Sequence, residues 1–187
     1  MDIEVVRPSE LSTAERAVWS QLQQTSRELD SPFLSPDWAL AVEEAEGPDS
    51  TARVVVLRED GRARGFMPLA IPHQTARPLG GPMCDYQAVV AETGVAIDPH
   101  AMIEALGVPR FDFANMLRSQ APFVPHIKGS VPAYAADLAQ GYDRYAEGMG
   151  GQDGILGELD ALREEMSREL GPLKYKALSR SRADLDQ

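Results

Sequence analysis

The chain has 187 residues, of which 43% are hydrophobic and 25% are charged, and its formal net charge is -11. This length suits one domain with a core of its own, and the acidic charge argues against nucleic acid as a partner. A single cysteine, Cys84, excludes an internal disulfide, and no apolar run approaches the roughly 20 residues that span a bilayer. Because the N-terminal stretch lacks the apolar core of a signal peptide, we expect a cytoplasmic protein.

The first fifty residues predict a strand and two helices. Residues 3–6 are apolar enough for an opening strand. Ser12 and Glu15 fit a capping box, which begins a helix over residues 12–28. Ser35-Pro36 begins a second helix, because proline suits the first helical position, and Gly47-Pro48 ends it.

The next segment predicts a β-hairpin. Residues 51–57 are rich in β-branched side chains, and residues 65–71 form a second apolar run. Asp60-Gly61 lies between them and is typical of a two-residue hairpin turn. Pro68 indicates that the second strand lies at a sheet edge or contains a bulge.

The middle of the chain alternates loops with short elements. Residues 72–85 are rich in glycine and proline and predict a loop. The pattern then predicts a strand over residues 86–90, a helix over 98–106 ended by Gly107, a strand around Phe111 and Phe113, and an irregular crossing over 119–129.

The last part of the chain predicts mainly helix. Residues 131–138 are a candidate short strand, and a glycine-interrupted helical stretch begins near Tyr142. A longer helix over residues 152–170 carries an apolar stripe. Residues 173–178 predict a final strand. We therefore expect an α/β fold of the α+β type, with a mixed sheet of about five to seven strands.

The predicted order, β-α-α-β-β-β-α-β, resembles that of the GNAT acyltransferase superfamily. The strings LSTAERAVWSQLQQ, SPFLSPDWALAVEEA, VVVLREDGRARGFMPLAI and RPLGGPMCDYQAVVA resemble the start of the CelD/BcsL group, GNAT-type proteins linked to cellulose and other exopolysaccharides. The best of these motifs are the aromatic-proline segment Phe33 to Trp38 and the segment Gly80 to Tyr86.

The resemblance implies a FemAB-like protein of two GNAT-like halves, about twice this length, with the acyltransferase half at the C-terminus. Residues 1–140 would then be a GNAT-like core, residues 141–187 would add the last helix and strand of the same half, and the catalytic second half would be absent. The group's helix corresponding to residues 152–170 is usually basic, whereas here it is acidic.

The resemblance also places an acyl-CoA phosphate loop between the fourth strand and the next helix. In this chain that place is residues 91–99, which hold one glycine, two acids and no arginine. Pro99 additionally lacks an N–H group. We therefore expect no cofactor site in this chain, whereas the intact protein would use acetyl-CoA or another acyl-CoA.

The segment from Arg77 to Tyr86 is the candidate substrate site. Gly80 and Gly81 would let a ligand approach the backbone, Arg77 could pair with a phosphate, and Asp85 with Tyr86 could hydrogen-bond a sugar. The alternative is a plain connection between strands.

Other residues give weaker signals. His73, His100 and His126 have no metal-ligand spacing, so we expect no metal site. Cys84 fits a small packed residue, and no serine lies in a nucleophile elbow, so the catalytic residues stay unassigned.

Two functions remain open. The first is the N-terminal, substrate-side half of an acyltransferase that acts on an exopolysaccharide sugar or a lipid-linked sugar. Its partner would be a C-terminal GNAT half or another polysaccharide-synthesis protein, and the chain alone would be inactive. The second is a non-catalytic interaction module with a degenerate GNAT fold.

Overall fold

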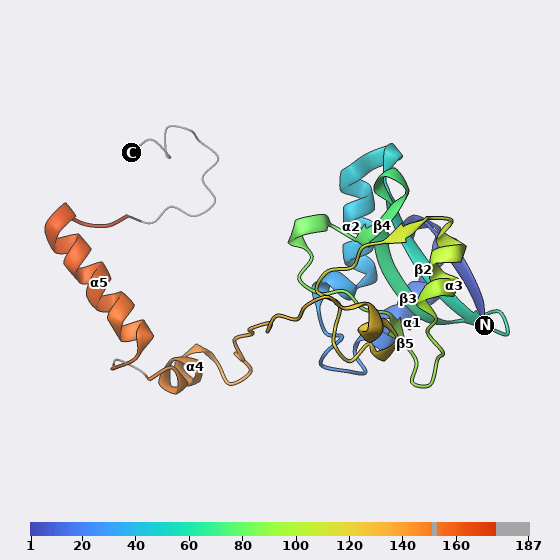
Figure 1. Ribbon diagram of the computed structural model, residues 1–187. Coiled ribbons are helices and arrows are strands. Elements are labelled where there is room, and N and C mark those ends of the chain that lie inside the picture. Colours follow the sequence, from blue (N-terminus) through green and yellow to red (C-terminus); the bar gives the residue numbers. More distant parts are fainter. Residues whose placement is uncertain (151–152, 175–187) are drawn as a thin grey trace. The chain divides into compact units, whose positions relative to one another are not determined.

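The computed structural model describes residues 1–150 and 153–174, in two compact units with a boundary after Gly129 (Figure 1). The first unit, Met1–Gly129, is built on a curled mixed sheet with helices on both faces, so it belongs to the mixed α and β class. The second unit begins at Ser130, and the elements described in it are helices. In the described residues, no helix is both long and apolar enough to cross a membrane.

Three consecutive antiparallel strands form the first part of the sheet. They are β1 (Asp2–Val6), β2 (Ala52–Glu59) and β3 (Arg62–Ala70), and β1 lies at the sheet edge. Asp60 and Gly61 join β2 to β3 with φ angles of 51° and 75°, as a type I′ hairpin turn requires. The predicted hairpin is confirmed.

Two short strands share the far edge of β3. They are β4 (Thr75–Pro78) and β5 (Val90–Ala91), both antiparallel to β3. Leu69 pairs with Pro78 of β4, and Phe66 pairs with Val90 of β5. These two positions are three residues apart in β3, but their partners are twelve residues apart in the sequence. The β4–β5 loop, residues 79–89, therefore interrupts what is otherwise one edge.

Three sequence expectations change here. Residues 72–85 were expected to be loop but contain β4, which follows β3 closely in the chain and pairs with its end. The strand expected at 86–90 is reduced to Val90–Ala91, preceded by a single parallel bridge from Gln87 to Met116. Pro68 lies in a central strand rather than at an edge, and the register irregularity of β2 and β3 falls at Leu57/Arg58 rather than at Pro68. Pro68 is opposite the interruption, where neither β4 nor β5 pairs with it. Its missing N–H is therefore tolerated.

A helical crossover completes the sheet. Asp98 caps α3 (Pro99–Leu106), and Gly107 ends it with a φ of 63°. The chain then forms β6 (Arg110–Phe111), parallel to β4. In the part of the chain that the structure describes, six strands follow the order β1-β2-β3-β4-β6, with β5 beside β3, which confirms the expected mixed sheet.

Two helices cover one face of the sheet. The capping box at Ser12 begins α1 (Thr13–Gln23), which ends five residues earlier than expected because Gln24 to Asp30 form turns. α2 (Pro36–Glu46) begins at the Ser35 cap, as expected. Trp19 of α1 is fully buried, stacks on Phe66 at 5.2 Å and donates its Nε1–H to the Leu34 carbonyl at 2.8 Å.

The other face is covered by α3 and by a 3-10 helix, Ala121–His126. The central strand β2 faces both layers: Val54 and Val56 pack under α1 and α2, whereas Val55 and Leu57 pack with Met102 and Phe123. Both core clusters lie within residues 1–129.

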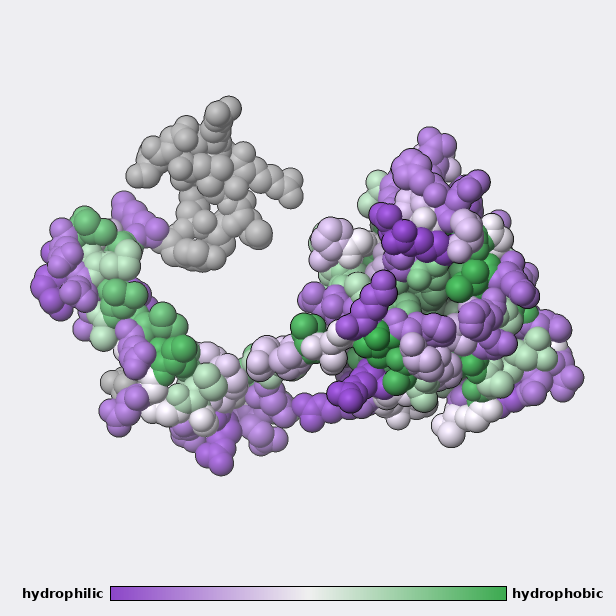
Figure 2. Space-filling view, viewed as in Figure 1, coloured by the Kyte–Doolittle hydropathy of each residue, from purple (hydrophilic) through white to green (hydrophobic). Residues whose placement is uncertain are grey.

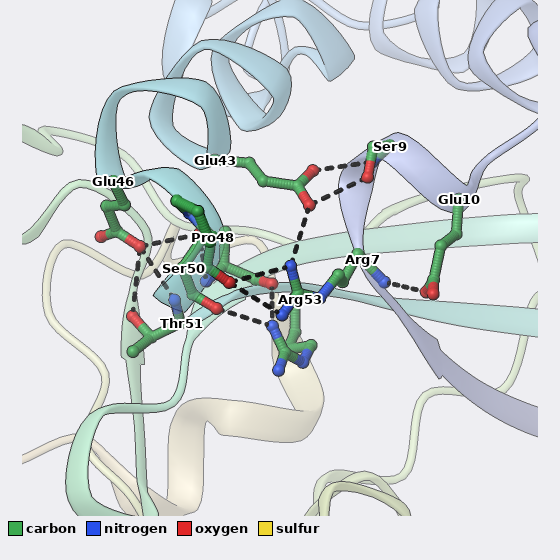
Figure 3. Close-up of polar contacts among 10 residues, drawn as sticks. Arg7, Ser9, Glu10, Glu43, Glu46, Pro48, Ser50, Thr51 and Arg53 are labelled. Atoms are coloured by element: carbon green, nitrogen blue, oxygen red, sulfur yellow. Dashed lines mark hydrogen bonds and ion pairs between the residues drawn. The ribbon is translucent and has the colours of Figure 1, made fainter.

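A polar network fastens α2 to the sheet (Figure 3). The Glu43 carboxylate is buried and accepts hydrogen bonds from the Ser9 N–H at 2.8 Å and the Ser9 hydroxyl at 2.9 Å, with Arg7 at 3.9 Å. Glu46 accepts from Ser50 and Thr51 at the entry to β2. These bonds give the buried Glu43 carboxylate hydrogen-bond partners, so we interpret the network as structural.

The second unit contains α4 (Tyr142–Gly148) and α5 (Ile155–Leu170). The strand expected over residues 131–138 is wrong: this segment is exposed and has no regular secondary structure, and it pairs with no strand among the described residues. The strand expected over 173–178 falls outside the described residues except for Leu173 and Lys174, which have no regular structure.

Candidate functional site

The parallel pairing of β4 and β6 gathers charged side chains where both strands end. Thr75 faces Arg110, Ala76 faces Phe111, and the Asp112 N–H donates to the Ala76 carbonyl at 2.9 Å. Ala76 is buried in the core, so strand alternation turns its neighbour Arg77 to the opposite face, and Arg77 is exposed. Arg77 and Asp112 therefore lie side by side, at neighbouring positions of two paired segments.

The electrostatics show that this group extends to four residues. The Arg110 Nε–H donates to Asp112 Oδ1 at 2.5 Å and lowers the pKa of that carboxyl, and Arg77 and Lys128 lower it further. We call Arg77, Arg110, Asp112 and Lys128 the basic cluster. The cluster thus has three cations and one anion, of which Arg110 and Asp112 are in direct contact, in a chain whose net charge is -11. A cluster of this composition is suited to bind an anionic ligand group such as a phosphate.

The two glycines of the loop have different surroundings. Gly80 has a φ of 83°, and a Cβ there would lie 2.5 Å from Cζ2 of Trp38. The Trp38 ring also donates its Nε1–H to the Leu79 carbonyl at 3.4 Å and meets Phe33 edge-on at 5.1 Å. The Trp38 indole ring therefore occupies the space beside Gly80. Gly81, in contrast, is exposed, and a Cβ there would meet nothing within 4 Å. Backbone approach by a ligand is open at Gly81.

The rest of the candidate segment is divided between core and surface. The Cys84 Sγ–H lies 3.0 Å from the Tyr86 carbonyl oxygen, and burial raises the pKa of this thiol. Cys84 is therefore a packed, protonated residue, as expected. Tyr86 is half-buried against the α1–α2 core, and Asp85 is exposed. Of the five predicted site residues, Arg77, Gly81 and Asp85 offer exposed groups.

A later segment holds this loop in place. The Asn115 side chain donates to the Cys84 carbonyl at 3.0 Å. The Gln120 amide accepts a hydrogen bond from the Val89 N–H at 3.1 Å and donates one to the Val89 carbonyl at 3.4 Å. The side chain thus pairs with the Val89 backbone as a neighbouring strand would. Sequence reasoning missed Asn115, Gln120, Arg110 and Lys128, because isolated polar residues in an irregular stretch carry no periodic signal.

Residues 91–99, the expected place of an acyl-CoA phosphate loop, lead into the N-terminal cap of α3. Oδ1 of Asp98 accepts hydrogen bonds from the N–H groups of His100 at 2.9 Å and Ala101 at 3.3 Å, at the first turn of α3. Glu92 pairs with Arg62 at 2.5 Å and Arg64 at 2.9 Å. Two backbone N–H groups at the first turn of α3 thus have a carboxylate partner.

Two of the three histidines come together in the fold. The rings of His100 and His126 meet edge-on with centroids 5.6 Å apart, and both are exposed. Within the described ranges, no group of three or more His, Cys, Asp or Glu side chains is placed to hold a metal ion.

Comparisons with family models, with curated proteins and with solved structures gave no match to this chain. The fold and the site define a mixed α and β domain with an exposed basic cluster beside a loop that interrupts its sheet edge.

Proposed function

We propose that the chain is the N-terminal, acceptor-side half of a GNAT-type acyltransferase of exopolysaccharide biosynthesis, without an acyl-CoA site of its own. The order of elements carries this proposal. Two helices, α1 and α2, separate β1 from β2, a meander follows, and α3 leads to β6. This order supports the resemblance to GNAT proteins suggested by the sequence.

The start of α3 supports the second part of the proposal. An acyl-CoA pyrophosphate needs free backbone N–H groups at this helix start, and here Asp98 accepts the bonds from His100 and Ala101. A pyrophosphate would have to displace a carboxylate that is covalently part of the chain. The donor site would then belong to the C-terminal half, which would supply acetyl-CoA or another acyl-CoA.

The basic cluster indicates the class of acceptor. Arg77 and Arg110 present guanidinium groups, which bind phosphate oxygens in pairs, and Asp85 can accept hydrogen bonds from sugar hydroxyls. A nucleotide-linked or lipid-linked sugar carries both groups. The cluster would hold the phosphate while the exposed end of the β4–β5 loop meets the sugar.

A non-catalytic interaction module is the second candidate. The observation that favours it is again the Asp98 carboxylate at the start of α3. If this carboxylate keeps acyl-CoA from binding, the domain lacks the donor that acyl transfer requires, and a binding role alone accounts for it. The discriminating property is binding of a phosphate-bearing sugar.

Calorimetry on the whole chain tests the proposal with two probes, UDP-glucose and acetyl-CoA. We expect UDP-glucose to bind and acetyl-CoA to give no heat of binding. Arg77→Ala should weaken UDP-glucose binding by about fivefold or more, the effect of losing about 1 kcal/mol. Arg144→Ala is the matched control, since Arg144 is an exposed arginine of α4 outside the cluster.

Three results would overturn the proposal. Micromolar binding of acetyl-CoA would place a donor site in this half. Equal effects of Arg77→Ala and Arg144→Ala would remove the basic cluster from the acceptor site. Failure of UDP-glucose to bind at millimolar concentration would favour the interaction module.

A further inference from the structure

One side of α5 carries large apolar residues that lie in solvent. Ile155, Leu159, Leu162, Met166 and Leu170 are between 41% and 75% exposed. Their spacings of four, three, four and four residues place them in one row along the helix, which is visible in Figure 2. We call this row the α5 stripe.

The stripe is unusual because the helices of this unit have no core of their own. Neither α4 nor α5 has a buried residue. Burying one leucine- or methionine-sized side chain stabilises a protein by about 1.5–3 kcal/mol, so five such side chains in water are a large unused contribution. A row of this length is typical of a face that another helix covers.

Charge borders the stripe unequally. Glu158, Glu165 and Glu169 recur at intervals of seven and four residues, which places them along one edge of the stripe. On the other edge Arg163 pairs with Asp160 at 3.4 Å. Among the described residues, no ion pair engages the three glutamates.

We propose that the α5 stripe is a docking surface for an amphipathic helix whose apolar row is bordered by lysine or arginine. Three glutamates along one edge, which form no ion pair within residues 1–150 and 153–174, are complementary to such a border. This inference is independent of the proposed enzymatic role.

A second copy of the chain fits the surface less well. In an antiparallel pair of α5 helices the glutamate edge faces itself, and in a parallel pair three glutamates meet an edge that has one arginine. α5 as a whole carries five acids and two arginines. The antiparallel pair therefore brings like charges together, and the parallel pair leaves most of the glutamates without a cation on the facing edge, so both arrangements disfavour self-association.

Fluorescence anisotropy on the whole chain tests the inference with two labelled synthetic helices. Both carry the same leucine row, one bordered by lysine and the other by glutamate. We expect the lysine helix to bind about tenfold or more tightly than the glutamate helix at low salt, with the difference shrinking as salt screens the charges. The double variant Glu158→Lys, Glu165→Lys should reverse the preference.

The stripe itself is tested by a matched pair of variants. Leu162→Ser should abolish binding of the lysine helix, whereas Ala161→Ser, on the opposite side of α5, should leave it unchanged, with helicity of both variants checked by circular dichroism. Equal binding of the two synthetic helices, no binding of either, equal loss in both variants, or a dimer of the chain that Leu162→Ser dissociates would each overturn the inference.

Discussion

Gly80 and Gly81 are adjacent residues with left-handed backbones and opposite surroundings. At Gly80 an added Cβ would meet Trp38 at 2.5 Å, and at Gly81 it would meet nothing within 4 Å. We expect Gly80→Ala to destabilise the protein by about 2 kcal/mol or more, because ring displacement adds to backbone strain. Gly81→Ala should cost about 1 kcal/mol, from backbone strain alone. Urea denaturation measures both values.

The difference between the two variants is the decisive quantity. Trp38 fluorescence should shift in Gly80→Ala and stay unchanged in Gly81→Ala. Equal destabilisation would mean that Trp38 does not occupy the space beside Gly80.

Glu15 gives the fold a pH-dependent contribution. Hydrogen bonds from Ser12 and then Arg58 lower the pKa of its carboxyl to about 2, from an ordinary value of 4.5. The folded state therefore holds the charged form more strongly than the unfolded state does. This stabilisation is complete above about pH 4.5 and is lost as the pH falls toward 2.

Glu15→Gln isolates this effect, because glutamine can keep the capping box while losing the ion pair with Arg58. We expect a loss of about 1 kcal/mol at pH 7, the upper range for a pair partly open to solvent. Melting curves of both proteins should converge as the pH falls from 4.5 toward 2. A gap that stays constant over this range would contradict the assignment.

At the scale of elements, the sequence predicts those helices and turns that neighbouring residues specify, and it fails for short strands that depend on pairing with another strand. The capping box at Ser12, the Asp60-Gly61 turn and the Asp98–Gly107 helix are each specified by neighbouring residues, and the structure confirms them. β4 and β5 have only four and two residues and depend on pairing with β3, so a proline- and glycine-rich sequence concealed them.

The same distinction applies to the candidate site. Arg77 could be predicted because it stands beside a recognisable glycine pair. Arg110 joins it through the parallel pairing of β4 with β6, Lys128 comes from the segment after the 3-10 helix Ala121–His126, and Trp38 reaches Gly80 from α2. None of these contacts leaves a local pattern in the sequence.

At the scale of the whole molecule, the two units differ in their means of stability. Both core clusters lie in the first unit, and α4 and α5 bury no residue. We expect a chain ending at Gly129 to unfold cooperatively within about 4 °C of the full chain, the shift that about 1 kcal/mol produces in a domain of this size. Differential scanning calorimetry measures this difference.

A shorter truncation provides the control. A chain ending at Gly107 lacks β6 and the buried Phe123, so it should lose the cooperative transition. A large loss of stability already at Gly129 would show that the second unit supports the first.

The interruption of the sheet edge has a consequence for how this domain can diversify. β4 and β5 are each anchored to β3 by their own residue pairs, so the register of one does not depend on the number of residues between them. Doubling the length of a flexible loop costs only about 0.6 kcal/mol of closure entropy. The exposed tip at Gly81-Pro82-Met83 can therefore accept insertions while Leu79 and Cys84 keep its two ends in the core. Variation in loop length next to the basic cluster would change which molecules fit there without redesign of the sheet.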